Sequence, residues 1–147
     1  MPAIQTNYTA THAVGFEGMV VNSEPSVIVS RIAEDAEGIG FGKVCVIGDR
    51  DNTVTDSEAS KAFEGIAVAD TTQPADTFAR YATVPVMKKG VIWVICSVNV
   101  AKGDPVYFVP ATGVLTNVSN SSANTLIANA SWDSAGTAAG LVKLRLA

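Results

Sequence analysis

Residues 102–118 (KGDPVYFVPATGVLTNV) constrain the fold of this chain most strongly, because they carry the pattern of a β-hairpin. The run VYFV at 106–109 is β-branched and aromatic, which suits a pleated, half-buried surface. The run PATG at 110–113 follows, in which proline presets φ for a turn and glycine supplies a left-handed residue. Strand-forming residues resume at Val114. The segment predicts two antiparallel strands.

Short strand-like segments recur along the rest of the chain at spacings typical of β-sandwiches and barrels. The strands that we expect outside the hairpin are residues 14–21, 27–32, 41–47, 65–69, 84–87, 91–98 and 141–146. The Lys-Lys-Gly sequence at 88–90 predicts a turn that joins 84–87 to 91–98 as a second hairpin. Residues 118–140 are small and polar, and we expect a long loop there.

These patterns predict an all-β fold, an antiparallel sandwich or a small barrel. Residues 1–15 carry no formal charge and have no periodicity, which favours an extended N-terminal arm. Residues 16–147 are expected to form a single β-rich domain, since a chain of 147 residues fits one domain. At most one short helix is expected, capped by Asp56 or Ser57 and ending at Phe63.

Charge and hydropathy exclude several classes of partner. The net charge of −4 and the absence of a basic patch argue against binding to nucleic acid. The apolar run around residues 91–96 is far shorter than the ~20 residues that span a bilayer, so no membrane association is expected. The N-terminus lacks the basic and apolar regions of a signal peptide. Cys45 and Cys96 each lie in an apolar run and are expected to be buried free thiols.

The sequence offers no convincing catalytic, cofactor-binding or metal-binding site. Residues 49–54 begin like a calcium loop, but Val54 stands where the sharp turn needs glycine. The glycine-rich run 38–42 lacks the third glycine of a dinucleotide fingerprint and precedes a strand. His12 is the only histidine, and two distant cysteines cannot complete a zinc site. We therefore expect no enzyme and no cofactor.

Several segments resemble the structural cement, or decoration, proteins of tailed bacteriophages. GDPVYF at 103–108 and PATGVL at 110–115 are similar to the last third of these proteins. Further similar segments follow in the same order along the chain: VGFEGMVV at 14–21, SRI at 30–32, GIAVADTT at 65–72, KGVIWV at 89–94 and AGLVKLRL at 139–146. The resemblance implies a jelly-roll-like or decoration-protein-like fold.

The same resemblance implies a location on the exterior of the virion capsid, after assembly in the host cytoplasm. A protein of this family is expected to bridge adjacent major capsid protein subunits and to stabilise the shell against internal DNA pressure. The symmetry of the shell favours a homotrimer at local threefold axes, with a dimer as the alternative.

Five residues are candidates for contact with the capsid or with another copy of the chain. They are Ile4 and Tyr8 in the uncharged arm, Phe16 and Met19 in the glycine-broken segment, and Trp132. Trp132 has two interpretations, burial, which is favoured, and a role in an interface. An exposed Trp132 would also suit an alternative function, a virion surface module that binds carbohydrate or a host receptor. A small hydrolase is a third hypothesis, but it lacks a suitable base.

Overall fold

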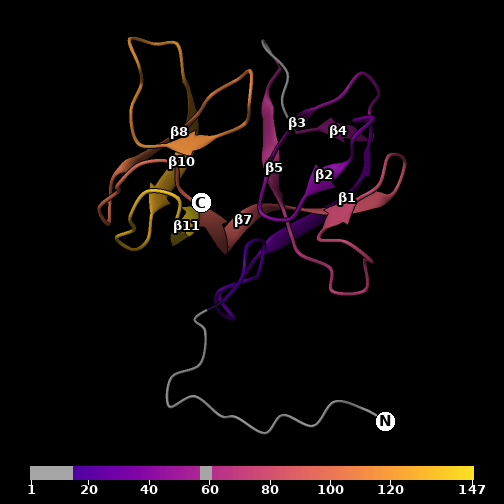
Figure 1. Ribbon diagram of the computed structural model, residues 1–147, viewed down its shortest axis with the longest axis horizontal. Helices are drawn as coiled ribbons and strands as arrows, with labels where there is room; N and C mark the ends of the chain where they lie inside the picture. Colours follow the sequence, from indigo (N-terminus) through magenta and orange to yellow (C-terminus); the bar gives the residue numbers. More distant parts are fainter. Residues whose placement is uncertain (1–14, 57–60) are drawn as a thin grey trace, which may run out of the picture.

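The computed structural model describes residues 15–56 and 61–147, and these residues form eleven β-strands and no helix. Figure 1 shows two lobes, one around β1 to β5 and one around β8, β10 and β11, with β7 running between them. The prediction of an all-β fold is confirmed. The expected short helix falls largely on residues 57–60, which lie outside the described residues, and Phe63 begins a strand.

The first lobe is a small closed barrel. Its strands pair in the ring β1–β4–β3–β5–β7–β1, and only the β1–β4 pair is parallel. The ring consists of β1 (Val27–Ala33), β4 (Thr53–Thr55), β3 (Val44–Ile47), β5 (Phe63–Ala67) and the first half of β7 (Thr83–Ile95). The short pair β2 (Ile39–Gly40) and β6 (Thr77–Phe78) forms a separate ladder. Closure leaves each strand of this ring with neighbours on both sides.

The second lobe is a sheet that continues from the other half of β7. Its strand order is β7–β11–β10–β8–β9, and every pair is antiparallel. The added strands are β11 (Leu141–Leu146), β10 (Thr125–Trp132), β8 (Pro105–Phe108) and β9 (Leu115–Thr116). The expected hairpin at 102–118 is confirmed, with Tyr107 opposite Thr116 and Phe108 opposite Leu115.

Alternation along the strands separates two hydrophobic cores. Cys45 on β3 and Val86 on β7 belong to the cluster that also contains Phe41 and Phe78. Their neighbours Val44, Val46 and Met87 belong instead to a cluster with β10 and β11. Because successive side chains of a strand point to opposite faces, one cluster fills the barrel and the other joins the barrel wall to the second sheet.

The structure corrects three expectations about individual segments. Residues 84–98 are not a hairpin, because β7 is one strand of 13 residues that passes through Lys88, Lys89 and Gly90. Residues 118–140 are not a long loop, because they contain the eight-residue strand β10. Within 15–21 there is no strand, and Val20 forms only an isolated bridge with Ile92. Long-range backbone pairing overrides local sequence in the first two cases, and in the third a turn at Glu17 and Gly18, where φ is +87°, interrupts the strand pattern.

Candidate interaction surface

The segment that leads into the barrel is anchored on β7. The Gly18 N–H donates to the Trp93 carbonyl at 2.8 Å, and the Trp93 N–H donates to the Met19 carbonyl at 2.9 Å. A Cβ at Gly15 would lie 2.6 Å from Cδ1 and Nε1 of the Trp93 indole, so glycine is required for this close contact. The backbone at residues 15–21 is therefore held in a defined position beside the second half of β7.

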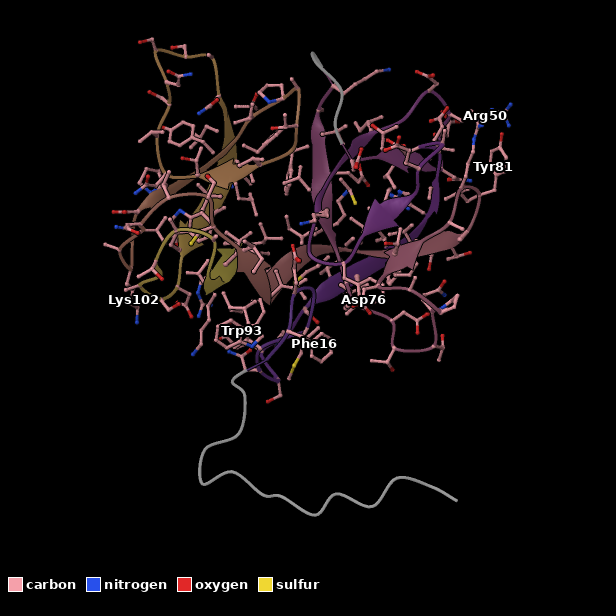
Figure 2. All side chains as sticks on the ribbon, in the orientation of Figure 1. Phe16, Arg50, Asp76, Tyr81, Trp93 and Lys102 are labelled. Carbon is pink, nitrogen blue, oxygen red and sulfur yellow. The ribbon has the colours of Figure 1, made fainter. Side chains whose placement is uncertain are left out.

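Two of the proposed contact residues lie in this anchored segment. Phe16 is 47 % exposed, and Met19 is half-buried. Phe16 borders a hollow of about 240 Å³ together with Phe41 and Asp76, and Figure 2 shows Phe16 and Trp93 at the same lower side of the molecule. An ion pair of 2.7 Å between Lys43 and Glu17 lines the same hollow. The arrangement presents an apolar ring beside polar groups, as in the core and rim of a protein interface.

The other candidates lie elsewhere. Ile4 and Tyr8 are outside the described residues. Trp132, at the end of β10, is 0 % exposed and packs in the core that joins the two lobes. Its indole therefore cannot contact another protein or a glycan while this fold is intact. The alternative of a carbohydrate-binding or receptor-binding module loses the residue on which it was based.

The surface has two further hollows. One of about 340 Å³ lies between the lobes and is lined by barrel residues such as Lys43 and by Ser97 and Gly113 of the second lobe. The other, of about 530 Å³, lies at the barrel and is lined by residues from β1, from the β3–β4 turn and from the loop before β7. Sequence reasoning found neither, because each is formed by segments that are distant along the chain.

Several ionisable groups take part in contacts that hold the fold together. Arg145 on β11 donates two hydrogen bonds to the Glu24 carboxylate, at 2.6 and 3.0 Å, and these bonds lower the pKa of Glu24. Burial raises the pKa of the Cys45 thiol, which keeps it protonated. Both cysteines are buried and free, as expected. Among the described residues, no group of three or more His, Cys, Asp or Glu side chains could hold a metal ion.

The two segments that were compared with cofactor-binding motifs, residues 49–54 and 38–42, form a turn and strands of the barrel lobe. Residues 49–52 form the turn between β3 and β4, where Lys61 pairs with Asp49 at 3.1 Å. The Glu34 carboxylate accepts hydrogen bonds from the Asp49 N–H and the Thr53 hydroxyl, at 2.8 and 2.7 Å. The run 38–42 contains β2 and leads into β3, with no helix start at its end. Within the described ranges, no helix is long and apolar enough to cross a membrane.

Comparisons with known proteins identify a family and a similar fold. Residues 4–147 match the model of the family described as Structural cement protein (E217 gp24/Pam3 gp6). A chain in the solved structure "The capsid of Myoviridae Phage XM1" has a similar fold, with a TM-score of 0.78. The alignment covers 99 % of this chain and 98 % of that chain at 17 % sequence identity. No curated protein matches the sequence.

Proposed function

Because this chain belongs to the phage structural cement protein family, we propose that it binds the outer surface of the icosahedral head and bridges adjacent major capsid protein subunits. As a member of this family, it is a structural component of the virion and is associated with the capsid. The observation that carries the proposal is the family match over residues 4–147, nearly the whole chain. The fold likeness to a chain of a phage capsid supports it.

The proposed mechanism is stabilisation by binding. A ligand that binds only the assembled shell stabilises it by RT ln(1 + [L]/Kd) per site. A homo-oligomer that touches several capsid subunits gains avidity, because its second and third contacts form intramolecularly. A closed oligomer matches the symmetry axes of a shell. We propose a homotrimer at local threefold axes, with a dimer at twofold axes as the alternative.

The proposed contact surface lies around the anchored segment. Phe16 is exposed beside a hollow, and Met19 is half-buried on a backbone that β7 holds in place. Because this backbone is already ordered, binding does not have to bear the entropy cost of ordering it. Ile4 and Tyr8 precede this segment in an arm, residues 1–15, that carries no formal charge and is inexpensive to desolvate. We propose that the arm and this side of the 16–147 domain contact the capsid together.

This mode of action requires no catalysis. The family is defined by a structural role, and this supports a chain that binds without transforming a substrate. Several of the described acids are held in ion pairs, for example Glu24 with Arg145 and Glu64 with Arg31. Such pairs fix side chains in place on the surface. The proposed function requires only that this surface binds the capsid.

The proposal is tested by binding to heads that lack this chain. Purified protein should co-sediment with such heads and saturate at a copy number comparable to that of the major capsid protein. Phe16→Ser should weaken binding without unfolding the protein, because the ring is exposed in the free chain. A matched control is Leu126→Ser, which removes another exposed apolar side chain, from the second lobe. Absence of saturable binding by the unaltered protein would contradict the proposal.

A further inference from the structure

The hollow at the barrel brings together an exposed aromatic ring and two arginines. It is lined by Ile32 of β1, Arg50 of the β3–β4 turn, and Arg80 and Tyr81 of the loop before β7. The Arg80 guanidinium lies 4.7 Å from the centroid of the Tyr81 ring. Figure 2 shows Arg50 and Tyr81 together at one edge of the molecule, with Lys102 on the opposite side.

Tyr81 is held in place by its backbone. The residue has a φ of 67°, in the left-handed region that residues other than glycine adopt only with backbone strain. Its N–H donates to the Ala33 carbonyl at 2.7 Å, and the Ala82 N–H donates to the Ala79 carbonyl at 3.0 Å. The tight turn leaves the ring 69 % exposed, the most exposed of the large hydrophobic side chains described. An aromatic side chain at a left-handed backbone position is therefore exposed to solvent here.

The two arginines differ from most other cations of the chain. Five of the ten Lys and Arg side chains form ion pairs with described residues, and Lys143 lies 5.6 Å from the centroid of the Trp93 ring. Among the described residues, Arg50 and Arg80 have no carboxylate partner, although acids outnumber bases fourteen to ten. Both converge on the hollow that holds Tyr81.

The carboxylates that line the hollow do not form ion pairs with Arg50 or Arg80. Glu34 already accepts hydrogen bonds from the Asp49 N–H and the Thr53 hydroxyl. Asp51 also lines the hollow but forms no ion pair with a described residue. A protein that covers the hollow must supply acceptors for the guanidinium groups, because a buried unpaired charge is strongly destabilising. Carboxylates match the fork of a guanidinium, and Tyr and Arg are enriched among residues that dominate binding energy.

We propose that this hollow, lined by Ile32, Arg50, Arg80 and Tyr81, is the docking site for an acidic segment of a capsid subunit. The aromatic ring and Ile32, which is 38 % exposed, supply apolar contact, and the arginines bind the carboxylates of the segment. This inference rests on the proposed function for the identity of the partner. It adds a second contact surface, distinct from the one around Phe16, with charge as the basis of its specificity.

The first test measures binding of variants to heads that lack this chain, at several salt concentrations. The double variant Arg50→Gln, Arg80→Gln should bind at least about tenfold more weakly and with a shallower salt dependence. Tyr81→Asn should also weaken binding, and asparagine tolerates the positive φ at this position. The control Lys102→Gln removes the same charge from the opposite side and should bind within about twofold of the unaltered protein. Thermal unfolding of each variant confirms that it is folded.

The second test identifies the partner group. Arg50→Lys and Arg80→Lys place an amine in the hollow, and a carbodiimide then joins that amine to any carboxylate in contact with it. Mass spectrometry should find the new lysines linked to an Asp or Glu of the capsid subunit, and Lys102 not linked. If the arginine variants bind as well as the unaltered protein and their lysines form no such link, this inference is wrong but the proposed function stands. If the unaltered protein does not bind heads, both are wrong.

Discussion

At Gly90 the backbone of β7 has a φ of +133°, in a region that residues with a side chain rarely adopt. The strand pairs with β1 and β5 before this residue, and with β11 from this residue onward. A Cβ here would lie 2.9 Å from the Ser26 Cβ and 3.1 Å from the Met87 sulfur. Gly90 is thus the residue at which β7 passes from its barrel partners to β11.

Because of its positive φ and its close contacts, replacement of Gly90 is expected to lower the stability of the fold. Gly90→Ala should lower the free energy of unfolding by roughly 2–4 kcal/mol, from backbone strain and overpacking together. The control is Gly103→Ala, where φ is +92° but nothing lies within 4 Å of the added Cβ. That variant should lose only about 1 kcal/mol. Urea denaturation of both proteins measures the difference, and equal losses would show that the contacts around Gly90 are unimportant.

Trp132 is a second residue whose substitution should lower the free energy of unfolding. It is 0 % exposed, and its indole N–H has no hydrogen-bond partner among the described residues. Trp132→Ala should lower the free energy of unfolding by roughly 3–5 kcal/mol, because it leaves a cavity. Trp132→Phe should lose less than about 2 kcal/mol, since it keeps an aromatic ring and removes an unpaired donor. A phenylalanine variant as unstable as the alanine variant would contradict this account. Denaturation followed by circular dichroism measures both.

At the scale of the element, the turn before β8 depends on the ionised side chain of Asp104. Its carboxylate accepts hydrogen bonds from the Ala101 N–H at 3.0 Å and the Asn117 side-chain amide at 2.9 Å. These two bonds lower the pKa of Asp104. They tie the turn to Asn117, directly after β9.

The lowered pKa of Asp104 determines how its contribution to folding stability changes with pH. Asp104 stabilises the folded chain above the pKa that it has when unfolded, and this contribution disappears as the pH falls through its folded pKa. Asp104→Asn should therefore be less stable than the unaltered protein at pH 7, and the difference should shrink toward pH 2. Melting temperatures of the two proteins from pH 2 to 7 test this. A constant difference over that range would rule out a role for the ionised form.

Elements with strong patterning could be predicted from sequence. The alternation of Val142, Leu144 and Leu146 gave the bounds of β11, and all three side chains are buried. In contrast, β10 contains Ala128, Asn129 and Ala130, which have low strand propensity. Its conformation is imposed by pairing with β8 and β11, and that pairing is irregular between Leu126 and Ser131. Long-range pairing of this kind leaves little trace in the local sequence.

The candidate surfaces were predictable only in part. Phe16 could be chosen because an aromatic residue stands in a glycine-broken segment, and the structure places it at the surface. The hollow around Arg50 and Tyr81 could not be predicted, because a turn and a loop thirty residues apart form it together with β1. Trp132 had two interpretations in sequence, and only the fold shows that the chain itself covers it.

On the scale of the whole molecule, we propose that residues 16–147 unfold as one domain although they contain two cores. β7 contributes Val84 and Val86 to the barrel core and Ile92 and Val94 to the other core. The barrel wall itself supplies Val44 and other residues to the second core. A shared strand and a shared wall couple the two lobes, which favours a single transition.

One buried thiol in each core allows this coupling to be measured. Cys45 lies in the barrel core and Cys96 in the core between barrel and sheet. In the single-cysteine variants Cys96→Ala and Cys45→Ala, the remaining thiol should become reactive toward a thiol reagent over the urea range in which that variant unfolds. In both variants, the free energy of the opening that exposes the thiol should equal the free energy of global unfolding. Reactivity of one thiol at clearly lower urea would show that the lobes open separately.

We propose that this chain strengthens a phage head by binding across its subunits. The direct measurement is the temperature at which heads release DNA, with the chain absent and after purified protein is added back to saturation. We expect a lower release temperature without the chain and recovery on addition, with weaker recovery for the Arg50→Gln, Arg80→Gln variant at limiting concentration. Heads that release DNA at the same temperature with and without the bound chain would contradict it.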